Sequence, residues 1–200
     1  EALAQVAGRL SWDQETVMPR GAAAQRAEEM GAMEAVLHAR RTDPRVGDWL
    51  AKAEAPDDAG AAQLRLIRRE YERATCVPAD LATALARLTS RAQGVWAQAR
   101  EASDFSAFAP VLDEVVRLKR EEGAALAKGG DVYDALLDGF EPGATAAGLQ
   151  AMFDEMRPRL VALRLRALDG PERPAVSGTF DEAAQMRLAR EMAERFGYDF

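Results

Sequence analysis

Hydrophobic residues in this chain recur at intervals of three and four along most of its length, and alternation at every second position is nearly absent. Spacings of three and four place apolar side chains on one face of an α-helix, whereas a half-buried strand needs alternation. The longest such stripe runs Leu81, Leu85, Leu88, Ala92, Val95, Ala99. Because short Pro-, Gly- and Asp-containing breaks separate the stripes, we predict an all-α fold of seven to eight helices in an antiparallel array.

Helix-start and helix-stop signals divide the chain into segments. The expected helices are 1–12, 22–41, a short one after the "TDP" at 42–44, helices that begin after Gly60, Pro78 and Asp104, a short helix after Asp131, 145–168 and 181–196. Residues 169–178 form the longest stretch without a helical pattern and predict a flexible linker. Too few residues follow this stretch for a second domain, so we expect one helical region over 1–200.

The composition narrows the class of protein. Of 200 residues, 48% are hydrophobic and the net charge is -7, which argues against a nucleic-acid partner because phosphate binding needs a basic patch. A single cysteine allows no internal disulfide. Because no apolar run reaches the ~18–20 residues of a membrane span and no signal peptide precedes the first helix, we expect no membrane association and a cytoplasmic location.

The two chain ends carry a separate expectation. The sequence begins without an initiator Met, inside a helical pattern, and it stops at "FGYDF" soon after a helix-ending glycine. We interpret both ends as those of a fragment of a longer protein.

The only histidine, His38, limits the chemistry that the sequence can support. Glu34 and His38 lie four residues apart and could give two metal ligands, but catalytic zinc needs three protein ligands. We therefore interpret them as an exposed polar pair on one helix face. Cys76 stands at a helix end and is expected to be a small, buried or half-buried side chain.

Adjacent acids and apolar stripes have structural interpretations. The acid pairs are expected on solvated helix faces or at helix starts near arginine; they are Glu28 with Glu29, Asp57 with Asp58, and Glu121 with Glu122. The aromatic and methionine stripes of the last long helices are expected to be core; they include Phe105, Phe108 and Leu112, and then Met152, Met156, Leu160 and Leu163. The sequence therefore offers no catalytic, metal-binding or cofactor-binding residue.

The run "LSWDQETVMPRG" at Leu10–Gly21 is the one candidate left. We expect Trp12 to anchor the end of the first helix against the core. The side chains from Asp13 to Thr16 are expected to cap the turn into the second helix. A role facing a substrate is the alternative.

Five stretches, in this order, resemble one protein family. They are "LSWDQETVMPRG", "REYERATCVP" (69–78), "SDFSAFAPVL" (103–112), "YDALLDGFEPGAT" (133–145) and "FGYDF" (196–200). Together they are similar to the thermostable carboxypeptidase (carboxypeptidase Taq) family of zinc metallopeptidases. Val17, Phe140 and Ala144 depart from the family pattern.

The resemblance implies a function for a longer protein. Family members are all-helical, cytoplasmic, commonly dimeric enzymes that remove single residues from peptide C-termini. Their zinc ligands are the two histidines of an H-E-x-x-H motif and a downstream glutamate, in the second half of the family's chain. No catalytic residue therefore transfers to a position here, and this chain is expected to be an N-terminal helical scaffold, inactive alone. The alternative is a stand-alone helical module that binds a protein or peptide, or self-associates, without catalysis.

Overall fold

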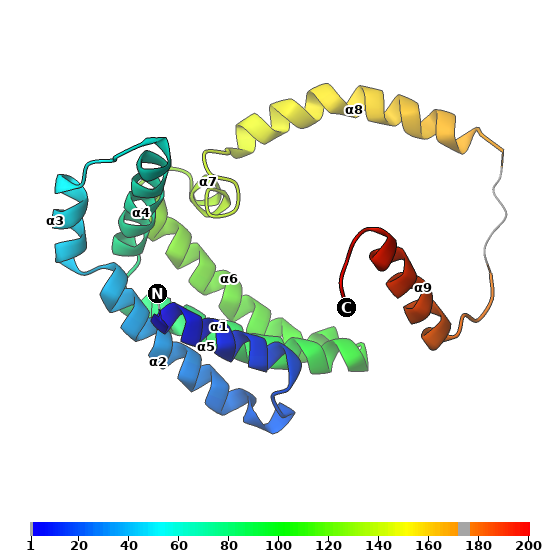
Figure 1. Ribbon diagram of the computed structural model, residues 1–200, viewed down its shortest axis with the longest axis horizontal. Coiled ribbons are helices and arrows are strands. Elements are labelled where there is room, and N and C mark those ends of the chain that lie inside the picture. The colour runs from blue at the N-terminus through cyan, green and yellow to red at the C-terminus, as the bar shows by residue number, and fades with distance from the viewer. Residues whose placement is uncertain (1, 172–176) are drawn as a thin grey trace. The chain divides into compact units, whose positions relative to one another are not determined.

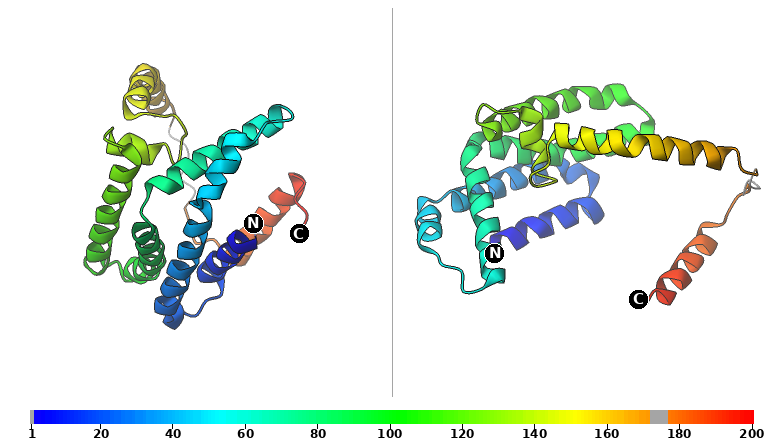
Figure 2. Two further views of the ribbon diagram at one scale, coloured as in Figure 1. Left: turned by 90° about the vertical axis from the view of Figure 1, so that its left-hand side faces the viewer. Right: turned by 90° about the horizontal axis from the view of Figure 1, so that it is seen from above.

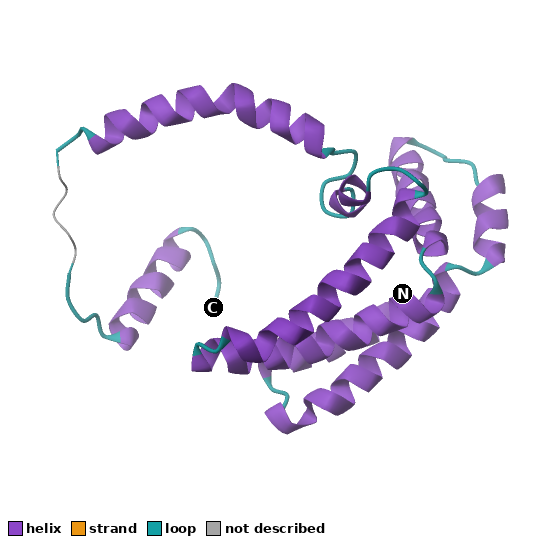
Figure 3. Cartoon of the chain, turned by 180° about the vertical axis from the view of Figure 1, so that it is seen from behind, coloured by secondary structure: helices purple, strands orange, loops and turns teal. Residues whose placement is uncertain are grey.

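The computed structural model describes residues 2–171 and 177–200 and contains nine α-helices and one 3₁₀ turn in those ranges, without a strand (Figures 1 and 3). The elements are α1 (Ala2–Thr16), η1 (Arg20–Ala22), α2 (Ala23–Arg41), α3 (Pro44–Lys52), α4 (Asp58–Cys76), α5 (Ala79–Ala102), α6 (Phe105–Ala127), α7 (Val132–Leu137), α8 (Ala146–Leu168) and α9 (Glu182–Arg195). The predicted all-α class is confirmed. The nine described helices are one more than the seven to eight that the sequence predicts.

Residues 1–151 form one compact unit, and its centre is the trio α2, α5 and α6. Helix α5 packs between α2 and α6 and is antiparallel to both, as Figures 1 and 2 show. Leu85 and Leu88 of α5 and Leu118 of α6 form its buried cluster. The predicted α5 stripe therefore does face the core.

Aspartates begin most of the helices by accepting a hydrogen bond from a backbone N–H of the first turn, as N-caps do. Asp43 accepts from Arg45 N ahead of the expected start at Pro44, and Asp104 accepts from Ala107 N ahead of α6. Asp57, Asp131 and Asp181 have the same role at α4, α7 and α9. Two helices end on left-handed residues, Ser103 (φ 53°) and Lys128 (φ 49°).

Residues 152–200 form the second unit, so the division falls inside α8, ahead of the predicted linker. Residues 172–176 of that 169–178 segment lie outside the described residues. Within this unit α8 and α9 contain no buried residue. None of the described helices combines the length and the apolar character that a bilayer crossing needs.

The expectation that the apolar stripes of the last long helices are core holds for one helix and fails for the other. In α6, Leu118 is buried and Leu112 is half-buried, although Phe105 is exposed. In α8, by contrast, Met152, Met156, Leu160 and Leu163 are all exposed, between 43% and 58%. The reason is physical: periodicity shows that a helix has an apolar face, but burial requires an element that covers it.

Candidate functional site

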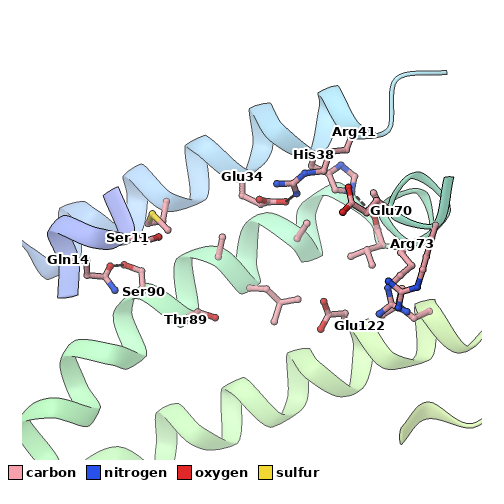
Figure 4. Close-up of a pocket in the computed structure, with 18 of the residues that line it drawn as sticks. Ser11, Gln14, Glu34, His38, Arg41, Glu70, Arg73, Thr89, Ser90 and Glu122 are labelled. Carbon is pink, nitrogen blue, oxygen red and sulfur yellow. Dashed lines mark hydrogen bonds and ion pairs between the residues drawn. The ribbon is translucent and has the colours of Figure 1, made fainter. Parts of the chain in front are cut away.

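A groove of about 790 Å³ opens in the first unit, and Figure 4 shows the side chains that line it. Its floor is one face of α5, where small side chains at Ala82, Ala86 and Ser90 flank Leu85. Residues of α1, α2, α4 and α6 form its walls. Polar side chains gather at its two ends, and Met30 and Leu126 also line it.

His38 lies at one end of the groove and is 8% exposed. Its Nε2 lies 2.8 Å from the backbone carbonyl oxygen of Val77, so the ring donates a hydrogen bond from α2 to the residue after α4. Glu34 instead accepts a 2.9 Å hydrogen bond from Arg41. The expectation of an exposed Glu34–His38 pair is therefore wrong, because Val77 occupies the ring nitrogen and Arg41 occupies the carboxylate.

Residues of the "LSWDQETVMPRG" run lie at the other end, and they belong to α1 rather than to a turn. The Oε1 atom of Gln14 accepts a short hydrogen bond from Ser90 of α5. Glu15 accepts a 2.8 Å hydrogen bond from Gln93 of α5. Asp13 accepts a 2.5 Å hydrogen bond from Arg26 of α2. The predicted capping role is wrong, since these three side chains join α1 to two other helices.

Trp12 also departs from its predicted role, because 62% of the residue is exposed. The sequence analysis ended the first helix at Trp12, whereas α1 continues to Thr16. The Oγ1 atom of Thr16 donates a 2.6 Å hydrogen bond to the Trp12 carbonyl oxygen, one turn earlier in the same helix. Trp12 therefore does not anchor the helix end against the core of this unit.

Arg69 and Arg73 of α4 form an ion-pair cluster with Asp138 that sequence analysis did not identify. Each arginine lies 2.6 Å from Oδ2 of Asp138, just beyond α7. The Asp138 Oδ1 atom accepts a hydrogen bond from the backbone N–H of Gly143, which lowers the pKa of this carboxyl, and the charge of Arg69 lowers it further. The arginines lie in the family-like stretch 69–78, and Asp138 lies in the stretch 133–145. Helical periodicity does not show that residues so far apart in the chain meet.

The remaining candidates have the structural positions that the sequence indicates. Cys76 is half-buried, and its thiol donates to the Glu72 carbonyl oxygen. Asp57 caps the start of α4, and Asp58 lies in the first turn of that helix. The other paired acids face basic side chains on helix surfaces: Glu28 with Arg87, Glu29 with Arg26, Glu121 with Arg117, and Glu122 with Lys119.

A zinc ion does not fit the donors that the described part of this chain offers. Nowhere in residues 2–171 and 177–200 do three His, Cys, Asp or Glu side chains converge as metal ligands would. His38 and Glu34 of the groove already bind Val77 and Arg41.

The first unit is thus an all-helical body with a polar-ended groove between its helices. The model of the carboxypeptidase Taq (M32) metallopeptidase family matches residues 1–200. This chain belongs to that family.

Known proteins support the same assignment. The chain is 38% identical to thermostable carboxypeptidase 1 of Thermus thermophilus, over 98% of this chain and 42% of that protein. It superimposes on Trypanosoma cruzi metallocarboxypeptidase 1 with a TM-score of 0.72 at 28% identity, over 100% of this chain and 42% of that one. The crystal structure of BsuCP shares the fold, with a TM-score of 0.88 at 24% identity over 99% of this chain and 41% of that one. The chain thus spans about two fifths of the length of the relatives that it matches.

Proposed function

We propose that these 200 residues are the N-terminal helical scaffold of a zinc metallocarboxypeptidase that removes C-terminal residues from peptides, and that they are inactive alone. The single observation that carries the proposal is the family match over residues 1–200 in a chain with one histidine. A catalytic zinc site needs three protein ligands and an open position, so a second ligand-bearing segment is required.

The groove gives this scaffold a part in substrate handling. Hydrogen bonds at its two polar ends hold the walls in place: Ser90 with Gln14 joins α5 to α1, and His38 with Val77 joins α2 to the end of α4. Leu85 and Leu126 line an apolar stretch in which side chains of an extended peptide can be desolvated. We propose that the groove forms one wall of the substrate path of the complete enzyme.

Calorimetric titration with zinc and an assay of C-terminal residue release test the proposal on this chain. We expect no zinc binding in the micromolar range and no release of a free amino acid from an N-blocked peptide. Thermus thermophilus thermostable carboxypeptidase 1 is the positive control, since it is a full-length relative. Zinc binding with a stoichiometry of one, or turnover above the buffer rate, would overturn the proposal.

The second candidate, a stand-alone module that self-associates without catalysis, is favoured by one observation, the exposed apolar side chains of α8. Light scattering on the purified chain tests this candidate, because a self-associating module has a mass that rises with concentration and a chain that stays monomeric argues against it. The same measurement tests the homodimer that the family resemblance implies. A cytoplasmic location is likewise part of the proposal, and the family resemblance supports it.

A further inference from the structure

Helix α8 exposes more large apolar side chains than any other helix described here. Met152, Met156, Leu160 and Leu163, spaced by four, four and three residues, share one face of the helix and are 43–58% exposed. Val161, Leu165 and Leu168 form a second apolar stripe and are 48–67% exposed. A helix that is apolar on more than one side is typical of a helix buried between other elements.

The charged side chains in the second half of α8 are all basic. From Met156 to Leu168 the helix carries four arginines and no acid. Arg157 lies 3.7 Å from Asp154, whereas Arg159, Arg164 and Arg166 have no ion-pair partner in the described part of the chain. Arg157 and Arg164 also flank an apolar hollow of about 280 Å³ beside Phe153, Met156, Leu160 and Val161. A complementary partner is therefore apolar at its centre and acidic at its rim.

A second copy of this chain is a poor occupant of that face. In a two-fold symmetric pair each α8 would meet the same surface of its partner, so arginine stripes would oppose arginine stripes. Like charges across an interface disfavour that pairing. The relatives offer a better occupant, because more than half of each relative's chain lies outside the part matched here.

We infer that α8 is the docking surface for the remaining part of an M32 carboxypeptidase, which covers Met152, Met156, Leu160 and Leu163 and presents acidic side chains to Arg159, Arg164 and Arg166. The inference rests on the proposed function, since it assigns the surface through which the scaffold meets the catalytic part.

Thiol labelling of a chimeric enzyme tests the docking surface. In the chimera this chain replaces the matched region of Thermus thermophilus thermostable carboxypeptidase 1. Both the chain alone and the chimera carry Cys76→Ala, with Leu160→Cys as the probe and Lys52→Cys on α3 as the exposed control. We expect the Leu160→Cys thiol to be labelled at least about tenfold more slowly in the chimera than in the chain alone. A covered thiol reacts only after the structure around it opens locally.

Each outcome of the labelling decides something. Equal labelling of the Leu160→Cys variant in the chimera and in the chain alone, with the Lys52→Cys control unchanged, overturns the inference. Protection in the chain alone, together with a dimer mass in sedimentation, assigns the face to a second copy and also overturns it. If the chimera is active and its thiol is labelled rapidly, the docking surface is refuted but the proposed function is not. If the thiol is protected and the chimera is inactive, only the proposed function is refuted.

Co-expression of the two parts as separate chains gives an independent measurement that does not depend on the chimera. The tagged chain is expected to co-purify with the remaining part of the Thermus thermophilus relative. Leu160→Glu should abolish co-purification, whereas Ala162→Glu, which places the same charge outside both apolar stripes of α8, should retain it. Co-purification that survives Leu160→Glu would contradict the inference, as would the absence of co-purification between the unmodified parts when both are soluble.

Discussion

The carboxylate of Asp13 in α1 and the guanidinium of Arg26 in α2 lie 2.5 Å apart, and the Arg26 side chain is only 11% exposed. Arg26 also donates to the Leu10 carbonyl oxygen and to Glu29, so one side chain binds three groups on two helices. Helix α1 contains no buried residue. Polar contacts therefore contribute to its attachment to the unit, and the Arg26 guanidinium that makes three of them is largely shielded from water.

A double-mutant cycle on Asp13→Ala and Arg26→Ala should show that the two residues stabilise each other. We expect their coupling to exceed that of Glu28 and Arg87, whose side chains are 65% and 46% exposed and therefore better screened by water. Urea unfolding followed by circular dichroism gives the four free energies of each cycle. Equal coupling in the two pairs would mean that Arg26 is no better shielded than a surface arginine.

Trp12→Ala should cost less than about 1 kcal/mol in the free energy of unfolding, because a mostly exposed side chain loses few contacts on truncation. Leu88→Ala is the matched core change; Leu88 is 4% exposed, and its truncation should cost about 2–5 kcal/mol. Urea midpoints of the two variants provide the comparison. A loss of several kcal/mol at Trp12 would restore the anchoring role that the sequence favours.

The helices and most of their caps could be predicted from the sequence, because three-and-four periodicity, Pro44 and Asp104 act within a few residues. The burial of single side chains could not. Trp12 and Met156 have apolar surfaces that favour burial, yet both are exposed, since burial depends on which element packs over them. For His38 the error is the opposite one: the sequence predicts an exposed side chain, but the ring is buried. Its hydrogen-bond acceptor, the carbonyl of Val77, lies 39 positions away in the chain.

The groove could not be predicted from the sequence either, because it depends on which helices pack together. Its hydrogen bonds join α1 to α5, as Gln14 to Ser90 does, and no local pattern shows which residues of distant helices meet. Side chains of the run at Leu10–Gly21 do meet other helices, but the sequence pattern ends the first helix at Trp12, four residues before the end of α1, and so favours a capping role for them.

Asp138 should make stability depend on acid pH. The Gly143 N–H and the charge of Arg69 hold its pKa below the usual value of an aspartate. A carboxyl with a lowered folded-state pKa stabilises the fold above its unfolded pKa of about 3.9, and this stabilisation disappears as the pH falls through the folded value. We therefore expect Asp138→Asn to lower the urea midpoint near neutral pH and to differ less from the unmodified chain below about pH 4.

The control for that titration is Asp113→Asn, a change at an exposed aspartate on α6. Its difference from the unmodified chain should stay small over the whole range. A constant difference between the Asp138→Asn variant and the unmodified chain at all pH values would show that the Arg69–Asp138 cluster acts through shape rather than charge.

Lys128→Gly should stabilise the fold by about 0.5–1 kcal/mol, because Lys128 ends α6 at a φ of 49°, where a side chain is strained and glycine is not. The matched control is Arg120→Gly, an exposed position inside the same helix, where glycine should cost up to about 1 kcal/mol. Thermal unfolding distinguishes opposite signs for the two changes. A loss of stability in both variants would argue against strain at the end of α6.

Gly123→Ala should destabilise the fold, because Gly123 lets α6 and α7 approach closely. A Cβ atom there would lie 2.7 Å from Cγ1 of Val132 and 3.0 Å from Cγ of Leu136, so α7 would have to shift. We expect a loss of about 1–3 kcal/mol, the usual cost of overpacking. Gly8→Ala in α1 is the control: its Cβ would meet nothing within 4 Å, and alanine should stabilise that helix by about 0.5–1 kcal/mol. Urea unfolding should therefore move the two midpoints in opposite directions, and a stabilising Gly123→Ala would mean that α7 yields without cost.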